Sequence, residues 1–88
     1  MIEREATIVN QEGLHARPAA QIVRLASSFS SEIELVKDGM DVNGKSIMGV
    51  MMLAAECGSS ILIRAEGPDA EQAVQALADL VAGGFGEP

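Results

Sequence analysis

The spacing of apolar residues changes several times along the chain, and this change of period most constrains the fold. From Met1 to Val9 apolar and polar residues alternate imperfectly, with Ile2, Ala6 and Ile8 on one side, as in a half-buried strand. From Ala16 onward the apolar residues recur every three or four positions, which is the spacing of an amphipathic helix. A chain whose period switches in this way must combine strands with helices.

The same patterns predict the remaining elements. Turn signals separate them, and the Asp38-Gly39 pair favours a hairpin. A strand is expected at Glu32 to Lys37, a short strand at Met40 to Val42, a short helix from Ser46 to about Leu53, a strand at 59 to 66 and a helix from 70 to Gly83-Gly84. The order is strand, helix, strand, strand, helix, strand, helix. We therefore expect one small α+β domain over residues 1–88, with a mostly antiparallel sheet and its helices on one face.

Charge narrows the possible partners. Six Lys and Arg residues are outnumbered by thirteen Asp and Glu, which gives a net charge of -7. This charge disfavours binding to a nucleic-acid phosphate backbone or to an anionic membrane.

The single Cys and the single His exclude a disulfide framework and a Cys/His zinc site, although a carboxylate-only metal site stays open. No stretch approaches the roughly 20 apolar residues of a membrane span. We expect a soluble, cytoplasmic monomer that binds no nucleic acid, metal or cofactor.

The segment Gly13-Leu14-His15-Ala16-Arg17-Pro18 lies where a loop meets a helix. A helix that begins just after His15 leaves backbone N–H groups unpaired and a partial positive charge, which together can bind an anion. Arg17 adds a full positive charge, and the same field disfavours imidazolium, so His15 should be a neutral nucleophile. These groups suit phosphoryl transfer through a covalent intermediate. The residues alone leave open that His15 is an ordinary helix-start residue and Arg17 an ordinary surface charge.

Two motifs in the sequence favour the first interpretation of His15, because together they carry a resemblance to a known family. The Gly13–Ala19 segment, followed about thirty residues later by Gly44-Lys45-Ser46-Ile47-Met48-Gly49-Val50-Met51, closely resembles the HPr family, the histidine phosphocarriers of the bacterial phosphoenolpyruvate-dependent phosphotransferase system. The resemblance covers essentially the whole chain. It implies an open-faced β-sandwich in which three helices cover one face of a four-stranded antiparallel sheet.

The resemblance also implies the chemistry. Enzyme I, charged by phosphoenolpyruvate, would phosphorylate His15 at Nδ1, and enzyme II A-type domains would then receive the phosphoryl group. Ala16 and Arg17 would bind the phosphate, which Arg17 would neutralise. Such a protein is a carrier with a covalent phosphohistidine intermediate and not an enzyme. Glu12 departs from the family pattern, because many members have a small polar residue there.

Ser46 has several possible roles. Gly39 to Ser46 matches the P-loop pattern G-x-x-x-x-G-K-[ST], but Met40 and Val42 alternate as a strand inside it, which disfavours a nucleotide site. Ser46 can instead cap the short helix, and the resemblance implies phosphorylation there by HPr kinase/phosphorylase in organisms that have that enzyme. The two roles are compatible.

The short helix has more apolar residues than one face can bury. We expect Ile47, Met48 and Met51 to be exposed and to dock partners such as enzyme I, with Val50 and Leu53 in the core; Met52 could serve either role. The alternative to a carrier is a regulatory module that acts by binding alone, with Ser46 as its switch. The Gly-Phe-Gly-Glu-Pro tail and the Met51–Ala55 run resemble the nitrogen-related branch of the family. These two short segments do not separate a role in sugar transport from a role in regulation, so both functions remain open.

Overall fold

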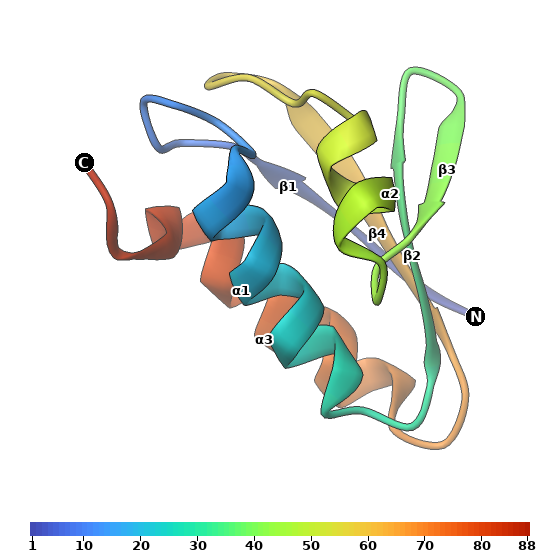
Figure 1. The fold of residues 1–88 in the computed structure, drawn as a ribbon. Helices are drawn as coiled ribbons and strands as arrows, with labels where there is room; N and C mark the ends of the chain where they lie inside the picture. Colours follow the sequence, from blue (N-terminus) through green and yellow to red (C-terminus); the bar gives the residue numbers. More distant parts are fainter.

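The computed structural model describes residues 1–88, and its elements follow the predicted order (Figure 1). They are β1 (Ile2–Thr7), α1 (Ala16–Ser27), β2 (Glu32–Lys37), β3 (Met40–Asn43), α2 (Ile47–Met52), β4 (Ser60–Glu66), α3 (Ala70–Ala82) and the 3-10 turn η1 (Gly84–Gly86). The turn η1 was not expected from the sequence. No helix is both long enough and apolar enough to cross a bilayer.

The four strands form one antiparallel sheet in the order β1-β4-β2-β3. The central strand β4 is flanked by β1 and β2, and Ile63 lies opposite Leu35 of β2 in the register. The three helices lie on one face of this sheet, so the molecule has two layers and its other sheet face is open (Figure 1). The predicted α+β open-faced sandwich is thus confirmed.

One hydrophobic core fills the space between the layers. Alternation places Ile61, Ile63 and Ala65 of β4 on the helix side, each no more than 1% exposed. The helices α1 and α3 meet them with Ile22 and Leu77, which are also 1% exposed. Apolar residues recur every second position on the strands and about every 3.6 positions on the helices, so both sets of side chains point into the same core.

The β2–β3 hairpin explains the apparent P-loop motif. Asp38 and Gly39 both have positive φ, 51° and 79°, as the favoured two-residue hairpin turns require. Met40–Asn43 then forms β3 and pairs with β2. Residues committed to a strand cannot also wrap a phosphate, so the structure agrees with the strand interpretation.

The first strand is shorter than the sequence pattern indicated. It ends at Thr7 and not at Val9. Beyond Thr7 the chain still bonds to the segment before β4, since Ile8 donates to the Ser59 carbonyl at 2.8 Å. Ile8 is fully buried while Val9 is 51% exposed. Ile8 therefore anchors the loop that leads to His15.

Candidate functional site

The loop before α1 is held on both sides. Gly13 has φ 68°, and this turn lets the Leu14 N–H donate to the Ala55 carbonyl at 2.9 Å. On the other side the Asn10 Nδ2 donates to the Gly13 carbonyl at 2.8 Å. Leu14 is buried. The backbone that presents His15 is thus tied to two separate parts of the fold.

His15 is the N-cap residue of α1, as predicted. Its carbonyl accepts the first helical hydrogen bond, from the Ala19 N–H at 3.0 Å. The N–H groups of Ala16 and Arg17 have no hydrogen-bond partner in the protein, and Pro18 has no N–H to satisfy. Two free donors therefore lie at the positive end of the helix dipole, beside an imidazole.

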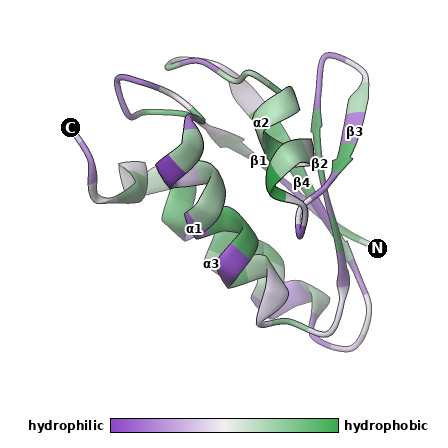
Figure 2. Ribbon diagram, viewed as in Figure 1, coloured by the Kyte–Doolittle hydropathy of each residue, from purple (hydrophilic) through white to green (hydrophobic).

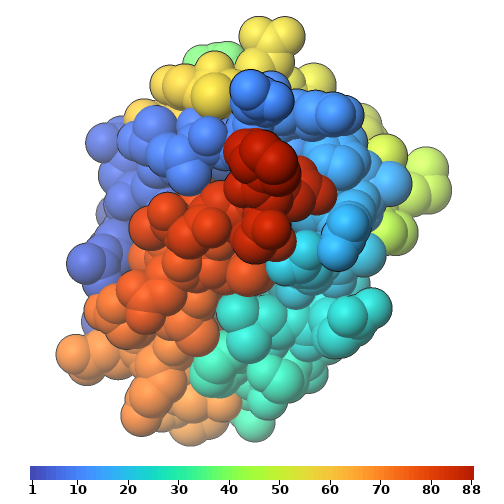
Figure 3. Space-filling view, turned by 90° about the vertical axis from the view of Figure 1, so that its left-hand side faces the viewer, coloured from blue at the N-terminus to red at the C-terminus, as the bar shows by residue number.

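The C-terminal tail also contributes to the site. This contribution was not predicted from the sequence. After η1 the chain returns to the start of α1, and the Gln11 N–H donates to the Pro88 carbonyl at 2.9 Å. Figure 3 shows this tail, in red, against the blue segment that leads into α1. Glu87 Oε1 accepts from His15 Nε2 at 3.0 Å and from Asn10 Nδ2 at 3.1 Å.

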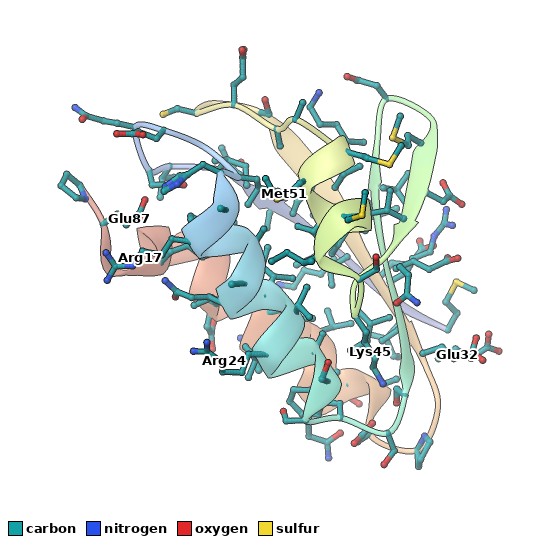
Figure 4. All side chains as sticks on the ribbon, in the orientation of Figure 1. Arg17, Arg24, Glu32, Lys45, Met51 and Glu87 are labelled. Atoms are coloured by element: carbon teal, nitrogen blue, oxygen red, sulfur yellow. The ribbon has the colours of Figure 1, made fainter.

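The site is a shallow hollow of mixed charge. It is lined by Gln11, Glu12, His15, Arg17, Glu87 and Pro88. The His15 side chain is 37% exposed and that of Glu87 only 13%, and Figure 4 shows Arg17 beside Glu87 at the start of α1. The hollow is open to a partner protein, whereas the Glu87 carboxylate is largely covered.

Electrostatics keep the Glu87 carboxylate ionised. The hydrogen bond from His15 is the main influence holding the pKa of Glu87 below its ordinary value. The Asn10 bond and the electrostatic influence of His15 and Arg17 lower this pKa further, against partial desolvation, which raises it. An ionised carboxylate can only accept hydrogen bonds, so the bond to His15 requires a proton on Nε2.

The second predicted region, α2, packs against α1. Ser46 is its N-cap, and its Oγ accepts from the Gly49 N–H at 3.2 Å, as expected. Val50 and Leu53 are buried. Figure 2 shows α2 in the green of hydrophobic residues.

The outer side of α2 forms an apolar patch, which we call the methionine patch. It consists of Ile47, Met48, Met51 and Met52, which are 43%, 72%, 43% and 64% exposed. The prediction that Ile47, Met48 and Met51 are exposed is confirmed, and Met52 joins them. The patch lies close in the fold to the histidine loop, because Leu14 bonds to Ala55 just after α2.

The structure places His15 and Ser46 at the helix starts where the sequence predicted them, with Arg17 in the first turn of α1. It also brings Asn10 and Glu87 to His15, which the sequence patterns did not indicate. One signal for the tail was present: Phe85 is one of only two aromatic residues, and it stands in a Gly-rich tail. Phe85 is 4% exposed, so it anchors the tail in the core.

No group of three or more His, Cys, Asp or Glu side chains is arranged to hold a metal ion.

Comparison with known proteins agrees with the geometry. A family model described as the PTS HPr component phosphorylation site matches residues 2–83. The phosphocarrier protein HPr of Cupriavidus necator is 47% identical over 87 residues, which are 99% of this chain and 98% of that protein. The HPr-like protein Crh of Halalkalibacterium halodurans is 48% identical over 77 residues, covering 88% of this chain and 92% of that protein.

The structural similarity is equally complete. The crystal structure of HPr from Thermoanaerobacter tengcongensis superposes with a TM-score of 0.96 at 50% sequence identity, covering 100% of this chain and 99% of that chain. Family model, relatives and fold agree over almost every residue. The chain therefore belongs to the HPr family of phosphocarrier proteins of the phosphotransferase system.

Proposed function

We propose that this chain is a covalent phosphoryl carrier, in which His15 accepts a phosphoryl group at Nδ1 from phosphorylated enzyme I. It then passes the group to enzyme II A-type domains. The observation that carries the proposal is the placement of His15 as the N-cap of α1, where the Ala16 and Arg17 N–H groups have no protein partner. A nucleophile beside unpaired donors is the arrangement that phosphoryl transfer needs.

The bonds balance without a proton donor. The Nδ1 lone pair attacks phosphorus, a P–N bond forms, and the bond between phosphorus and the donor breaks. The Nε2 proton stays in place, so the ring becomes a phosphoimidazolium while the donor regains its electron pair. The phosphoryl oxygens gather charge where the free N–H groups and Arg17 can stabilise it.

We further propose that the methionine patch docks enzyme I and the acceptor domains. Apolar residues exposed together on a small protein are typical of an interaction surface, and methionine side chains adapt to partners of different shape. The patch adjoins the loop that presents His15. A partner seated on it would cover the hollow and exclude water during transfer.

The second candidate is a regulatory module that works through binding, with a phosphate on Ser46 as its switch. The observation that favours it is the position of Ser46, which caps α2 immediately before the methionine patch. A phosphate there stays at the favourable end of the helix dipole. HPr kinase/phosphorylase is the class of enzyme that would add it. This role is compatible with carriage on His15.

Incubation with enzyme I and phosphoenolpyruvate, followed by intact-mass measurement, tests the carrier function. The protein should gain one acid-labile phosphoryl group, and His15→Ala should gain none while keeping its melting temperature, because His15 fills no core cavity. Labelling that persists in His15→Ala would overturn the assignment. No gain in the unaltered protein would favour the purely regulatory alternative.

A further inference from the structure

Three side chains from distant parts of the sequence meet at the imidazole. Asn10 comes from the loop after β1, His15 from the start of α1 and Glu87 from the tail. One oxygen, Glu87 Oε1, accepts from both His15 Nε2 and Asn10 Nδ2. Glu87 lies outside residues 2–83, the part of the chain that the family model matches.

We propose that Glu87, held in place by Asn10, is a positioning residue for phosphoryl transfer. It keeps the His15 proton on Nε2, which leaves the Nδ1 lone pair free to attack phosphorus. It then balances the positive charge of the ring once Nδ1 is phosphorylated. This inference rests on the proposed carrier function.

The tautomer follows from the chemistry of the pair. A neutral imidazole has one N–H and one lone pair, and the partner of one nitrogen determines which is which. An ionised carboxylate offers only acceptors. The nitrogen that faces Glu87 must therefore hold the proton, and the nucleophilic lone pair is directed to Nδ1.

The carboxylate is fixed in place by the fold and is not a mobile chain end. Phe85 is buried in the core, and its carbonyl accepts from the Gln21 side chain at 3.3 Å. Pro88 on the other side of Glu87 accepts from the Gln11 N–H. The backbone is thus tied both before and after Glu87, which limits the directions that its side chain can take.

Asn10 has the properties of a support for Glu87. Its side chain is almost completely buried, at 1% exposure, and its Nδ2 donates to the Gly13 carbonyl as well as to Glu87. The Gly13 bond fixes the direction of the amide, and the second N–H then points at Glu87. Asn10 Oδ1 has no partner, so every hydrogen bond of this side chain serves the histidine loop or the carboxylate.

The charges in the hollow are arranged in agreement with this role. Glu87 binds Nε2, so it leaves the other ring nitrogen, Nδ1, free of this contact. The unpaired N–H groups of Ala16 and Arg17 begin α1 directly after His15. Arg17 lines the same hollow as Glu87, and its positive charge offsets the negative charge of the carboxylate.

Nitrogen-15 NMR of the His15 ring tests the proposal on the unphosphorylated protein. The unaltered chain should show the Nε2–H tautomer, and Glu87→Ala should raise the Nδ1–H fraction. The initial rate of labelling by enzyme I should fall about fivefold to tenfold in Glu87→Ala, the size expected for losing one partly exposed charged hydrogen bond. Glu12→Gln, which removes a carboxylate from the same hollow with no bond to His15, should leave the tautomer unchanged.

The conservative variant separates the two parts of the role. In Glu87→Gln the amide oxygen can still accept from Asn10 and His15, so the Nε2–H tautomer should persist while the loss of charge slows labelling to an intermediate rate. A tautomer distribution in Glu87→Ala equal to that of the unaltered protein would overturn the proposal, as would an equal shift in Glu12→Gln. Failure of the carrier function itself would appear differently, as no labelling of the unaltered protein.

Discussion

Gly13 is the residue on which the position of His15 depends most directly. Its φ of 68° lies in the left-handed region, and an added Cβ would overlap the Ala55 carbonyl oxygen and lie 3.0 Å from the Glu56 Cα. Both neighbours are backbone atoms, which cannot rotate away. The Gly13→Ala substitution must therefore move the loop or break the hydrogen bond from Leu14 to Ala55.

The expected loss of stability has two parts. A left-handed φ costs an alanine about 1 kcal/mol relative to glycine. Relief of the overlap separates the Leu14 N–H from the Ala55 carbonyl in a buried place, which costs roughly 1–3 kcal/mol more. The sum of about 2–4 kcal/mol corresponds to a fall in melting temperature on the order of 10 °C or more for a domain of this size.

Gly39→Ala is the matched control, because Gly39 also has positive φ but an added Cβ would meet nothing within 4 Å. It should lose only the conformational part, about 1 kcal/mol. Thermal and urea unfolding followed by circular dichroism measure both variants. Labelling of His15 should slow in Gly13→Ala and not in Gly39→Ala when both are folded. Equal losses of stability in the two variants would refute the close-approach argument.

Three further predictions concern charge. Arg17→Ala should slow transfer from His15 to an acceptor at least about tenfold in stopped-flow, yet lower the melting temperature by under about 2 °C, because an exposed charge contributes little to folding. Ser46→Asp should weaken enzyme I binding in titration calorimetry with the melting temperature level or higher, since the charge adjoins the methionine patch but favours the α2 dipole; unchanged affinity would place Ser46 outside the docking surface. Hydrogen bonds, first from the Ser31 hydroxyl and then from the Ser30 and Ser31 N–H groups, hold the pKa of Asp69 below its ordinary 3.8. A lowered folded-state pKa stabilises the protein above pH 3.8 and the contribution is lost as pH falls through the folded value, so the stability difference from Asp69→Asn should be full near neutral pH and narrow below 3.8; a constant difference would contradict it.

Most of the fold could be predicted because its determinants are local. The period of apolar residues identifies each strand and helix, and Asp38-Gly39 identifies the hairpin that pairs β2 with β3. The pairing of β4 with β1 and β2 joins distant segments, and the expected sheet arrangement came from the resemblance to the HPr family. The end of β1 was missed by two residues because an edge strand has one neighbour only, so fewer pairing bonds extend it. The helix start at His15 followed from Gly13 and Pro18, which act within one turn.

The part of the site that could not be predicted depends on contacts across the whole chain. Asn10 and Glu87 are 77 positions apart, and no local pattern joins them. Their contact exists only because Phe85 enters the core and returns the tail to α1. The one indication in the sequence was Phe85, a large apolar residue in a Gly-rich tail. It suggests that the tail packs on the domain but does not indicate against which surface.

The most direct test of the account is onward transfer from the phosphorylated protein. The chain is charged with labelled phosphoenolpyruvate and enzyme I, separated from both, and mixed with an enzyme II A-type domain. A carrier should lose its label from His15 as the acceptor gains it in equal amount, and Arg17→Ala should do so more slowly. A phosphorylated protein that keeps its label, or releases it only to water, would contradict the central claim.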